Sequence, residues 1–206
     1  WLVVLVGAAM VFFTMGTRQS IGLFLKPVTE DLGTDRESLA LALAAHNQIR
    51  GFPLAAKVSD SLGPRRVVAV TGLLMGAGLA IAARADSKAG VGVSLALLFG
   101  VAVSGSSFVV VIGAVGKAVP ASTQSFAFGI ITAGASRGMF VMVPIAQGLI
   151  AAFGWRGAMG TLAAVAVVVI GGASRLLPAD ADGPPSPNAA DAAVESISDA
   201  VRRAFR

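Results

Sequence analysis

Long apolar runs separated by short polar stretches dominate this sequence. The runs cover residues 1–25, 39–59, 67–83, 90–115, 125–153 and 157–177. At a rise of about 1.5 Å per residue, α-helices of such length can cross a hydrocarbon core of about 30 Å. We therefore expect an all-α integral membrane protein with six transmembrane helices in residues 1–177.

The composition favours a membrane protein and argues against several other classes. Of the 206 residues, 55% are hydrophobic and only 13% are charged, which few soluble domains share. The absence of cysteine and the single histidine disfavour disulfides and a protein-built zinc or iron–sulfur site, so we expect no metal and no cofactor. The formal charge of +5 does not indicate nucleic acid, because the basic residues lie at the ends of apolar runs. The expected partner is a lipid bilayer.

A short charged hairpin, beginning at Asp60, connects the second and third runs. Gly63 and Pro64 are expected to interrupt the helix and reverse the chain, with Arg65 and Arg66 at the cytoplasmic headgroups. With this hairpin inside, eight Lys and Arg residues lie on the cytoplasmic side and five lie outside. We therefore predict a multi-pass protein of the inner cell membrane with both termini cytoplasmic.

Other polar stretches predict further turns and a tail. Residues 26–37 predict a polar loop, and residues 154–156 predict a tight turn with Trp155 at the membrane interface. Residues 178–206 predict a cytoplasmic linker, and the first run starts at Trp1 without a Met, so we expect a fragment or a processed product. The alternatives for the end of the linker are a solvated tail and a short amphipathic helix. That helix would carry four apolar side chains on one face: Val194, Ile197, Val201 and Phe205.

Pairs of glycines occur four residues apart in two of the runs. Gly72 and Gly76 lie in the third run, and Gly134 and Gly138 lie in the fifth. Small residues at this spacing let membrane helices approach closely where no hydrophobic effect drives them together. We interpret these glycines as helix-packing positions rather than as substrate contacts.

The fifth run also matches the GxSxG pattern of hydrolases, through Gly134, Ser136 and Gly138, with His46 as a candidate base. The hydrolase motif places its serine on a sharp turn between a strand and a helix. Ser136 instead lies inside an apolar run with a helical pattern, so we interpret the match as chance. We predict that the protein is not an enzyme.

Several motifs resemble those of the major facilitator superfamily of transporters. Asp60, Gly63, Arg65 and Arg66 fit the loop GxxxDRxGRR that joins the second and third helices of that family. Residues 17–25 are similar to the first helix of its branch of oxalate/formate antiporters and monocarboxylate carriers. Further stretches agree with that branch in the same order: Pro27, residues 30–33, 105–108, 113–120 and 126–138, Pro144, and residues 153–156. Two positions depart from the loop pattern: Ala56 and Ser61.

The resemblance implies a twelve-helix carrier built of two six-helix halves, each made of two inverted three-helix repeats. This chain would be the N-terminal half, and the missing C-terminal half would be its partner. The implied function is secondary active transport by alternating access, for small organic anions such as mono- or dicarboxylates. Asp60, Gly63, Arg65 and Arg66 would form a conformational latch between the halves. The alternatives are a truncated, non-transporting membrane protein or assembly partner, and a carrier for another solute class such as drug efflux.

Basic residues inside the runs are the candidates for substrate binding, because an intramembrane arginine is costly and normally faces a cavity or a partner. Arg18 shares a helical face with Thr14 and Gly22, and its two-pronged guanidinium suits a carboxylate. The alternative is that Arg18 reaches the outer interface or pairs with Glu30 or Asp31.

A second group of basic residues follows one stripe of the second run. His46, Arg50 and Lys57 could line a path for an anion. Arg137 in the fifth run, the counterpart of the second run in the inverted repeat of the family, would form a paired anion site with Arg50. The alternative, which we favour, is sequence drift at both arginines in a degenerate or incomplete carrier.

Overall fold

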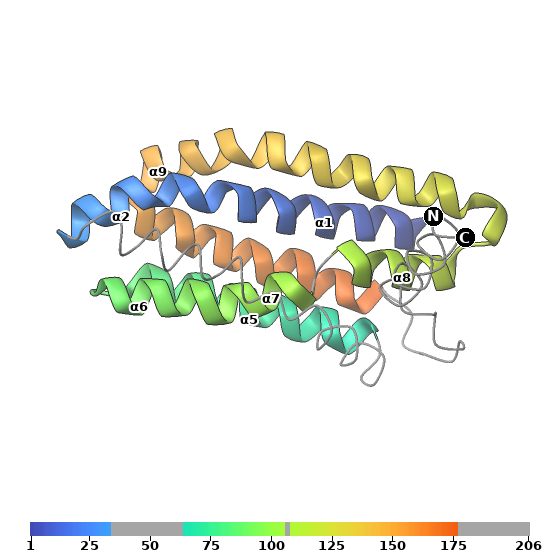
Figure 1. Cartoon of the computed structure of the whole chain (residues 1–206), viewed down its shortest axis with the longest axis horizontal. Coiled ribbons are helices and arrows are strands. Elements are labelled where there is room, and N and C mark those ends of the chain that lie inside the picture. The colour runs from blue at the N-terminus through green and yellow to red at the C-terminus, as the bar shows by residue number, and fades with distance from the viewer. Residues whose placement is uncertain (34–63, 106–107, 177–206) are drawn as a thin grey trace, which may run out of the picture.

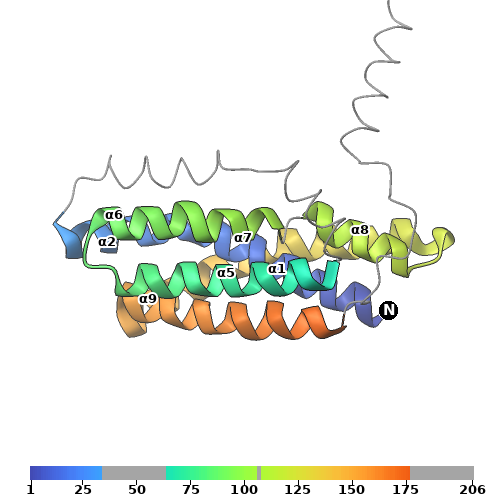
Figure 2. The same ribbon diagram turned by 90° about the horizontal axis from the view of Figure 1, so that it is seen from below.

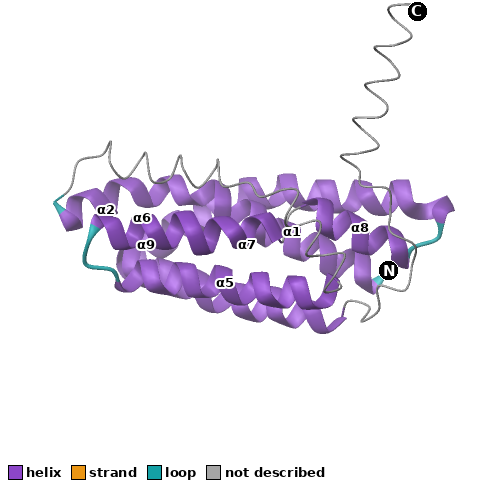
Figure 3. Cartoon of the chain, turned by 60° about the horizontal axis from the view of Figure 1, so that its bottom comes forward, coloured by secondary structure: helices purple, strands orange, loops and turns teal. Residues whose placement is uncertain are grey.

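Helices make up every regular element in the part of the chain that the structure describes. This computed structural model describes residues 1–33, 64–105 and 108–176. In chain order, the elements are α1 (Leu2–Ser20), η1 (Ile21–Phe24), α2 (Leu25–Leu32), α5 (Pro64–Arg84), α6 (Lys88–Val93), η2 (Ser94–Phe99), α7 (Gly100–Gly105), α8 (Phe108–Ala118), η3 (Ala121–Thr123) and α9 (Gln124–Leu176). The long helices lie lengthwise beside one another in a bundle (Figures 1 and 3). Within the described ranges, the expected all-α fold is confirmed.

The first three elements, α1, η1 and α2, form one helical rod over Leu2–Leu32. The loop predicted over residues 26–37 therefore begins too early. Shortly before Pro27 the helix tightens to the 3₁₀-helix η1. Because proline has no N–H, one backbone carbonyl of the preceding turn lacks its usual hydrogen-bond donor. Val28 is buried, so α2 still packs one face on the bundle. The rod ends at Gly33, whose φ of 58° is the left-handed conformation common after helices.

Helix α5 begins three residues before the predicted third run, at Pro64. Proline suits the first turn of a helix, because the N–H that it lacks would have no intrahelical partner there. Arg65 and Arg66 are exposed in this first turn. Pro64 therefore lies in the first turn of α5. The predicted chain reversal before it, with Asp60 and Gly63, lies outside the described residues and stays a prediction.

The fourth run, predicted as one helix over residues 90–115, is divided among α6, η2, α7 and α8. Ser87 caps α6, because its hydroxyl oxygen accepts a hydrogen bond from the N–H of Gly90 at 3.1 Å. The element η2 is a π-helix that packs on α5: a Cβ atom placed at Gly78 would lie 2.9 Å from the backbone nitrogen of Phe99. This run is therefore less regular than a single α-helix.

Helix α9 contains both the fifth and the sixth predicted runs. Its backbone leaves the helical conformation at Gly154, where φ is 68° and ψ is 174°, a combination open to glycine and rarely to other residues. The chain reverses there, so a first arm (residues 124–153) and a second arm (residues 155–176) run in opposite directions (Figure 1). The predicted turn at this position is confirmed.

Three helices among the described residues are long and apolar enough to cross a membrane, one of them being α9 with both of its arms. They cover Leu2–Leu32, Arg65–Arg84 and Ala121–Leu176. The second predicted span, residues 39–59, lies outside the described residues, as does the predicted linker over residues 178–206. The count of six spans therefore stays a prediction.

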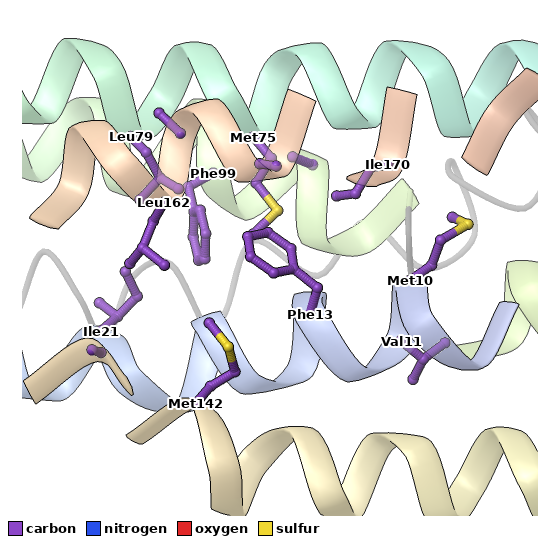
Figure 4. Close-up of a cluster of buried hydrophobic side chains, with 14 of the residues drawn as sticks. Met10, Val11, Phe13, Ile21, Met75, Leu79, Phe99, Met142, Leu162 and Ile170 are labelled. Carbon is purple, nitrogen blue, oxygen red and sulfur yellow. The ribbon is translucent and has the colours of Figure 1, made fainter. Parts of the chain in front are cut away.

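Large apolar side chains fill the space between α1, α5, η2 and the second arm of α9 (Figure 4). Phe13 of α1 and Met75 of α5 point toward each other, and both are buried. A thioether beside an aromatic ring packs favourably and tolerates an irregular interior. Phe99 of η2 and Leu162 of the second arm are also fully or almost fully buried in this cluster. The interior is therefore shared by elements far apart in the sequence.

The first arm of α9 and α1 approach each other at glycines. A Cβ atom placed at Gly134 would lie 3.0 Å from the backbone oxygen of Ala8, and one at Gly138 would collide with the backbone oxygen of Phe12. On the opposite side of the contact, a Cβ atom at Gly16 would lie 2.6 Å from the backbone oxygen of Gly138. These glycines therefore bring the two backbones closer than other side chains permit.

The second arm of α9 and α5 lie side by side with glycines between them (Figure 2). A Cβ atom placed at Gly72 would lie 2.9 Å from the Cβ atom of Ile170. One placed at Gly76 would lie 2.5 Å from a methyl carbon of Val167. Both pairs of glycines identified in the sequence thus lie at helix contacts.

We expect Gly138→Ala to destabilise the protein by about 1–3 kcal/mol, because its methyl group would collide with the backbone of α1. Gly148→Ala is the matched control in the same arm, since a Cβ atom there meets nothing within 4 Å. Alanine is the better helix former, so the control should be neutral or more stable by up to about 1 kcal/mol. Thermal unfolding of the two variants in detergent measures the difference, and equal melting temperatures would contradict the packing.

Candidate functional site

One side of the first arm of α9 carries polar side chains that face outward from the bundle. We call this side the polar face, and it consists of four exposed residues: Thr132, Ser136, Arg137 and Gln147. The exposed side chains between the charged ends of α5 are apolar: Val70, Leu73 and Ile81. The first arm also exposes large apolar side chains beside its polar ones: Phe126, Met139, Phe140, Ile145 and Phe153. Apolar side chains suit lipid, whereas polar ones within a span normally face a cavity or a protein partner. The first arm thus combines exposed polar and apolar side chains inside an apolar run.

Arg137 lies where the polar face meets a groove of about 810 Å³. The groove runs between α1 and both arms of α9, and it is lined by these residues: Ala8, Ala9, Phe12, Phe13, Gly134, Arg137, Val141, Met142, Ile145, Leu149, Thr161, Leu162, Val165 and Val169. Arg137 is the one charged residue in this lining of described residues. No described acidic side chain forms an ion pair with it. Its guanidinium is therefore available to an anion.

The position of Arg137 along the arm is also informative. At about 1.5 Å per residue, it lies about 20 Å from Gln124 and about 24 Å from Phe153, near the middle of the arm. An apolar groove with a few convergent polar groups is the usual form of a small-molecule site. A guanidinium in such a setting can hold a carboxylate by two parallel hydrogen bonds.

Arg18, the other candidate on a described helix, does not line this groove. It is half-buried in the last turn of α1, whereas Thr14 is fully buried and Gly22 is exposed. The three residues predicted to share a face therefore differ in their surroundings. The hydroxyl oxygens of Thr14 and Thr17 are buried without a hydrogen-bond partner among the described residues. The structure does not bring Arg18 and Arg137 together in the groove.

The remaining candidates fall largely outside the described residues. These are His46, Arg50, Lys57, Asp60 and Gly63. Arg65 and Arg66 of the predicted latch loop are exposed at the start of α5. The latch and the paired anion site of Arg50 and Arg137 stay predictions.

Sequence reasoning missed a cluster of charged and aromatic residues at the end of the bundle opposite the N-terminus. It consists of Asp31 at the end of α2, Asp86 between α5 and α6, and Trp155 and Arg156 at the start of the second arm of α9. Trp155 is only 6% exposed, so its indole packs inside the end of the bundle, while its position at the membrane interface stays a prediction. Asp31 contacts the guanidinium of Arg156. The partners are too far apart in the sequence for spacing to reveal them.

Comparison with known proteins supports the resemblance seen in the motifs. The profile of the Major Facilitator Superfamily matches residues 7–206. Human Monocarboxylate transporter 11 is 29% identical over 210 residues, which cover 100% of this chain and 44% of the relative. Rat Monocarboxylate transporter 13 is 26% identical over 182 residues, covering 86% of this chain and 42% of the relative. The chain therefore spans less than half the length of these relatives.

Cysteine labelling can distinguish the polar face from the lipid-facing surface, because the chain has no native cysteine. We expect Ser136→Cys on the polar face to react readily with a water-soluble maleimide in membranes, since the reaction needs a hydrated thiolate. Val168→Cys is the control, because Val168 is 72% exposed on an apolar side of the second arm. It should remain largely unlabelled. Equal labelling of both variants would show that the polar face is not hydrated.

Proposed function

Because this chain belongs to the Major Facilitator Superfamily, we propose that it forms the N-terminal half of a secondary active transporter working by alternating access. Residues 1–177 would be a six-helix membrane domain, and residues 178–206 a cytoplasmic linker to the second half. Its relatives, of which it spans less than half, carry the name of monocarboxylate transporters. Both termini would lie in the cytoplasm, on the inner side of the cell membrane, because this places most basic residues inside.

The polar face of α9 is the observation that carries this proposal. Ser136, Arg137 and Gln147 would be costly neighbours for lipid, because hydrocarbon offers no hydrogen-bond partners. A second six-helix half covering this face would supply such partners or enclose a hydrated cavity against it. Substrate sites of two-half carriers lie near the membrane midplane between the halves, which is the depth expected for Arg137.

The proposed substrate is a small organic anion such as a mono- or dicarboxylate. Arg137 would bind the carboxylate, and the apolar lining of the groove would contact the carbon chain. Arg18, His46 and Arg50 are further candidates for the same role. No covalent chemistry is needed, because the carrier moves its substrate by exposing the site alternately to the two sides.

Arg137→Ala should weaken anion binding in the complete carrier by about 10- to 100-fold, since a hydrogen bond to a charged group contributes about 1.5–3 kcal/mol. Arg137→Lys keeps the charge but loses the planar fork, so we expect an intermediate loss. Arg175→Ala, an exposed arginine in the last turn of α9, is the control and should leave affinity unchanged. Counterflow of labelled monocarboxylates in liposomes measures these affinities. An unchanged affinity in Arg137→Ala would remove Arg137 from the substrate site.

We expect the 206-residue chain alone to show no saturable uptake, because alternating access needs two halves that move against each other. The measurement is uptake of labelled monocarboxylates into liposomes that hold the purified chain. Liposomes that hold the complete carrier are the positive control. Saturable uptake by the monomeric chain would contradict the assignment as half a carrier. An inactive complete carrier would instead favour a non-transporting role.

A further inference from the structure

Three segments from distant parts of the sequence meet at the end of the bundle opposite the N-terminus (Figures 1 and 3). They are the end of α2, the turn between α5 and α6, and the reversal between the two arms of α9. Each contributes charged or aromatic side chains to one cluster, which we call the clasp: Asp31, Asp86, Trp155 and Arg156.

Arg156 is the centre of the clasp. Its Nη2 lies 3.4 Å from Oδ2 of Asp31 and 3.2 Å from Oδ1 of Asp86. Its Nη1 donates a hydrogen bond to the backbone oxygen of Ala83 at 3.4 Å, and its Cζ lies 4.6 Å from the centre of the Trp155 ring. One guanidinium therefore contacts all three segments.

Trp155 strengthens the contact between the first and third segments. Its Nε1 donates a hydrogen bond to Oδ2 of Asp31 at 3.1 Å, the same oxygen that faces Arg156. Two glycines with positive φ shape the backbone on either side: Gly33 directly after α2, with φ 58°, and Gly154 directly before Trp155, with φ 68°. The reversal at Gly154 places Trp155 at this end of the bundle, beside Asp31.

The number of coupled contacts, rather than burial, separates the clasp from an ordinary surface ion pair. The side chains of Arg156, Asp31 and Asp86 are 38%, 48% and 90% exposed, and isolated pairs of this kind contribute little. The shared oxygen, the indole N–H and the ring stacked beside the guanidinium couple these contacts into a network. We propose that the clasp couples the three segments into one rigid unit, with Arg156 as the positioning residue that holds them together.

Only the role of the clasp during transport rests on the proposed function. In a carrier, a half whose end is held by the clasp would move as one rigid body when the two halves rock against each other. The test of the clasp itself needs no transport. Hydrogen exchange in the purified protein reports opening of each segment separately. In Arg156→Gln we expect faster exchange at residues 29–33 and at residues 84–90 together, although both lie far from residue 156 in the sequence. Faster exchange confined to residues next to 156 would overturn the proposal.

Trp155→Phe removes the indole N–H and one ring but keeps an aromatic side chain beside Arg156, so it should speed exchange at residues 29–33 more than at residues 84–90. The matched control is Lys26→Gln, which removes an exposed ion pair with Glu30 at 3.9 Å on α2 near the same end. It should change neither segment. If the Arg156→Gln variant does not fold, the same measurement is made on Arg156→Lys. Lysine keeps the positive charge but lacks the planar guanidinium, so it cannot contact all three segments at once.

A double-mutant cycle of Asp31→Ala and Arg156→Gln provides an independent measurement. We expect each single change to lower the melting temperature by about 2–6 °C, and the double change to lower it by clearly less than the sum of the two single effects. Fully additive shifts would overturn the clasp. A coupled clasp together with a complete carrier that does not transport would refute the proposed function and leave this inference standing, whereas additive shifts in an active complete carrier would do the reverse.

Discussion

The backbone contact between α1 and the first arm of α9 is the constraint on which the bundle depends. Lipid is as apolar as leucine, so helices in a membrane gain little from apolar burial and instead need close packing. Gly16 and Gly138 supply it by placing each backbone in the space that a side chain would otherwise fill. One side of α1 packs against the first arm of α9. Its other side places Met10 and Phe13 in the apolar interior that α5 and the second arm also line. A central helix thus carries contacts on both of its sides.

The all-α class and the reversal at Gly154 could be predicted from the sequence, because both depend on neighbouring residues in the chain. The apolar runs are long enough for helices, and Gly154 with Arg156 interrupts two of them. The end of the first rod could not be predicted as well, because Pro27 and the charges after it suggest a loop, while tertiary packing of Val28 sustains the helix. For the candidate site, Arg137 stood out as a charge inside an apolar run. Its groove did not, because three helical segments form it together. The contact of Asp31 with Trp155 joins residues too distant for any sequence pattern.

The two arms of α9 have similar residue compositions but expose different side chains at the surface of the described bundle. Both arms of α9 are rich in small apolar residues, and their sequences look alike. Only in the structure do Ser136 and Gln147 fall outside while Ala135 and Ala146 fall against the other helices. The same alternation on the second arm exposes Val168 and buries Ala166. The first arm therefore exposes a charged side chain, Arg137, near its middle, whereas the charged side chains of the second arm lie at its ends.

The π-helix η2 has a consequence for how the fourth run presents itself to the membrane. A π turn takes more residues than an α turn, so every residue beyond it is rotated backward compared with an unbroken α-helix. Val93 before η2 and Val101 after it are both about half exposed, although eight residues of α-helix would turn them well apart. The extra winding changes the angular phase of the run, so Val93 and Val101 lie at the surface on both sides of η2 although an unbroken α-helix would turn them about 80° apart.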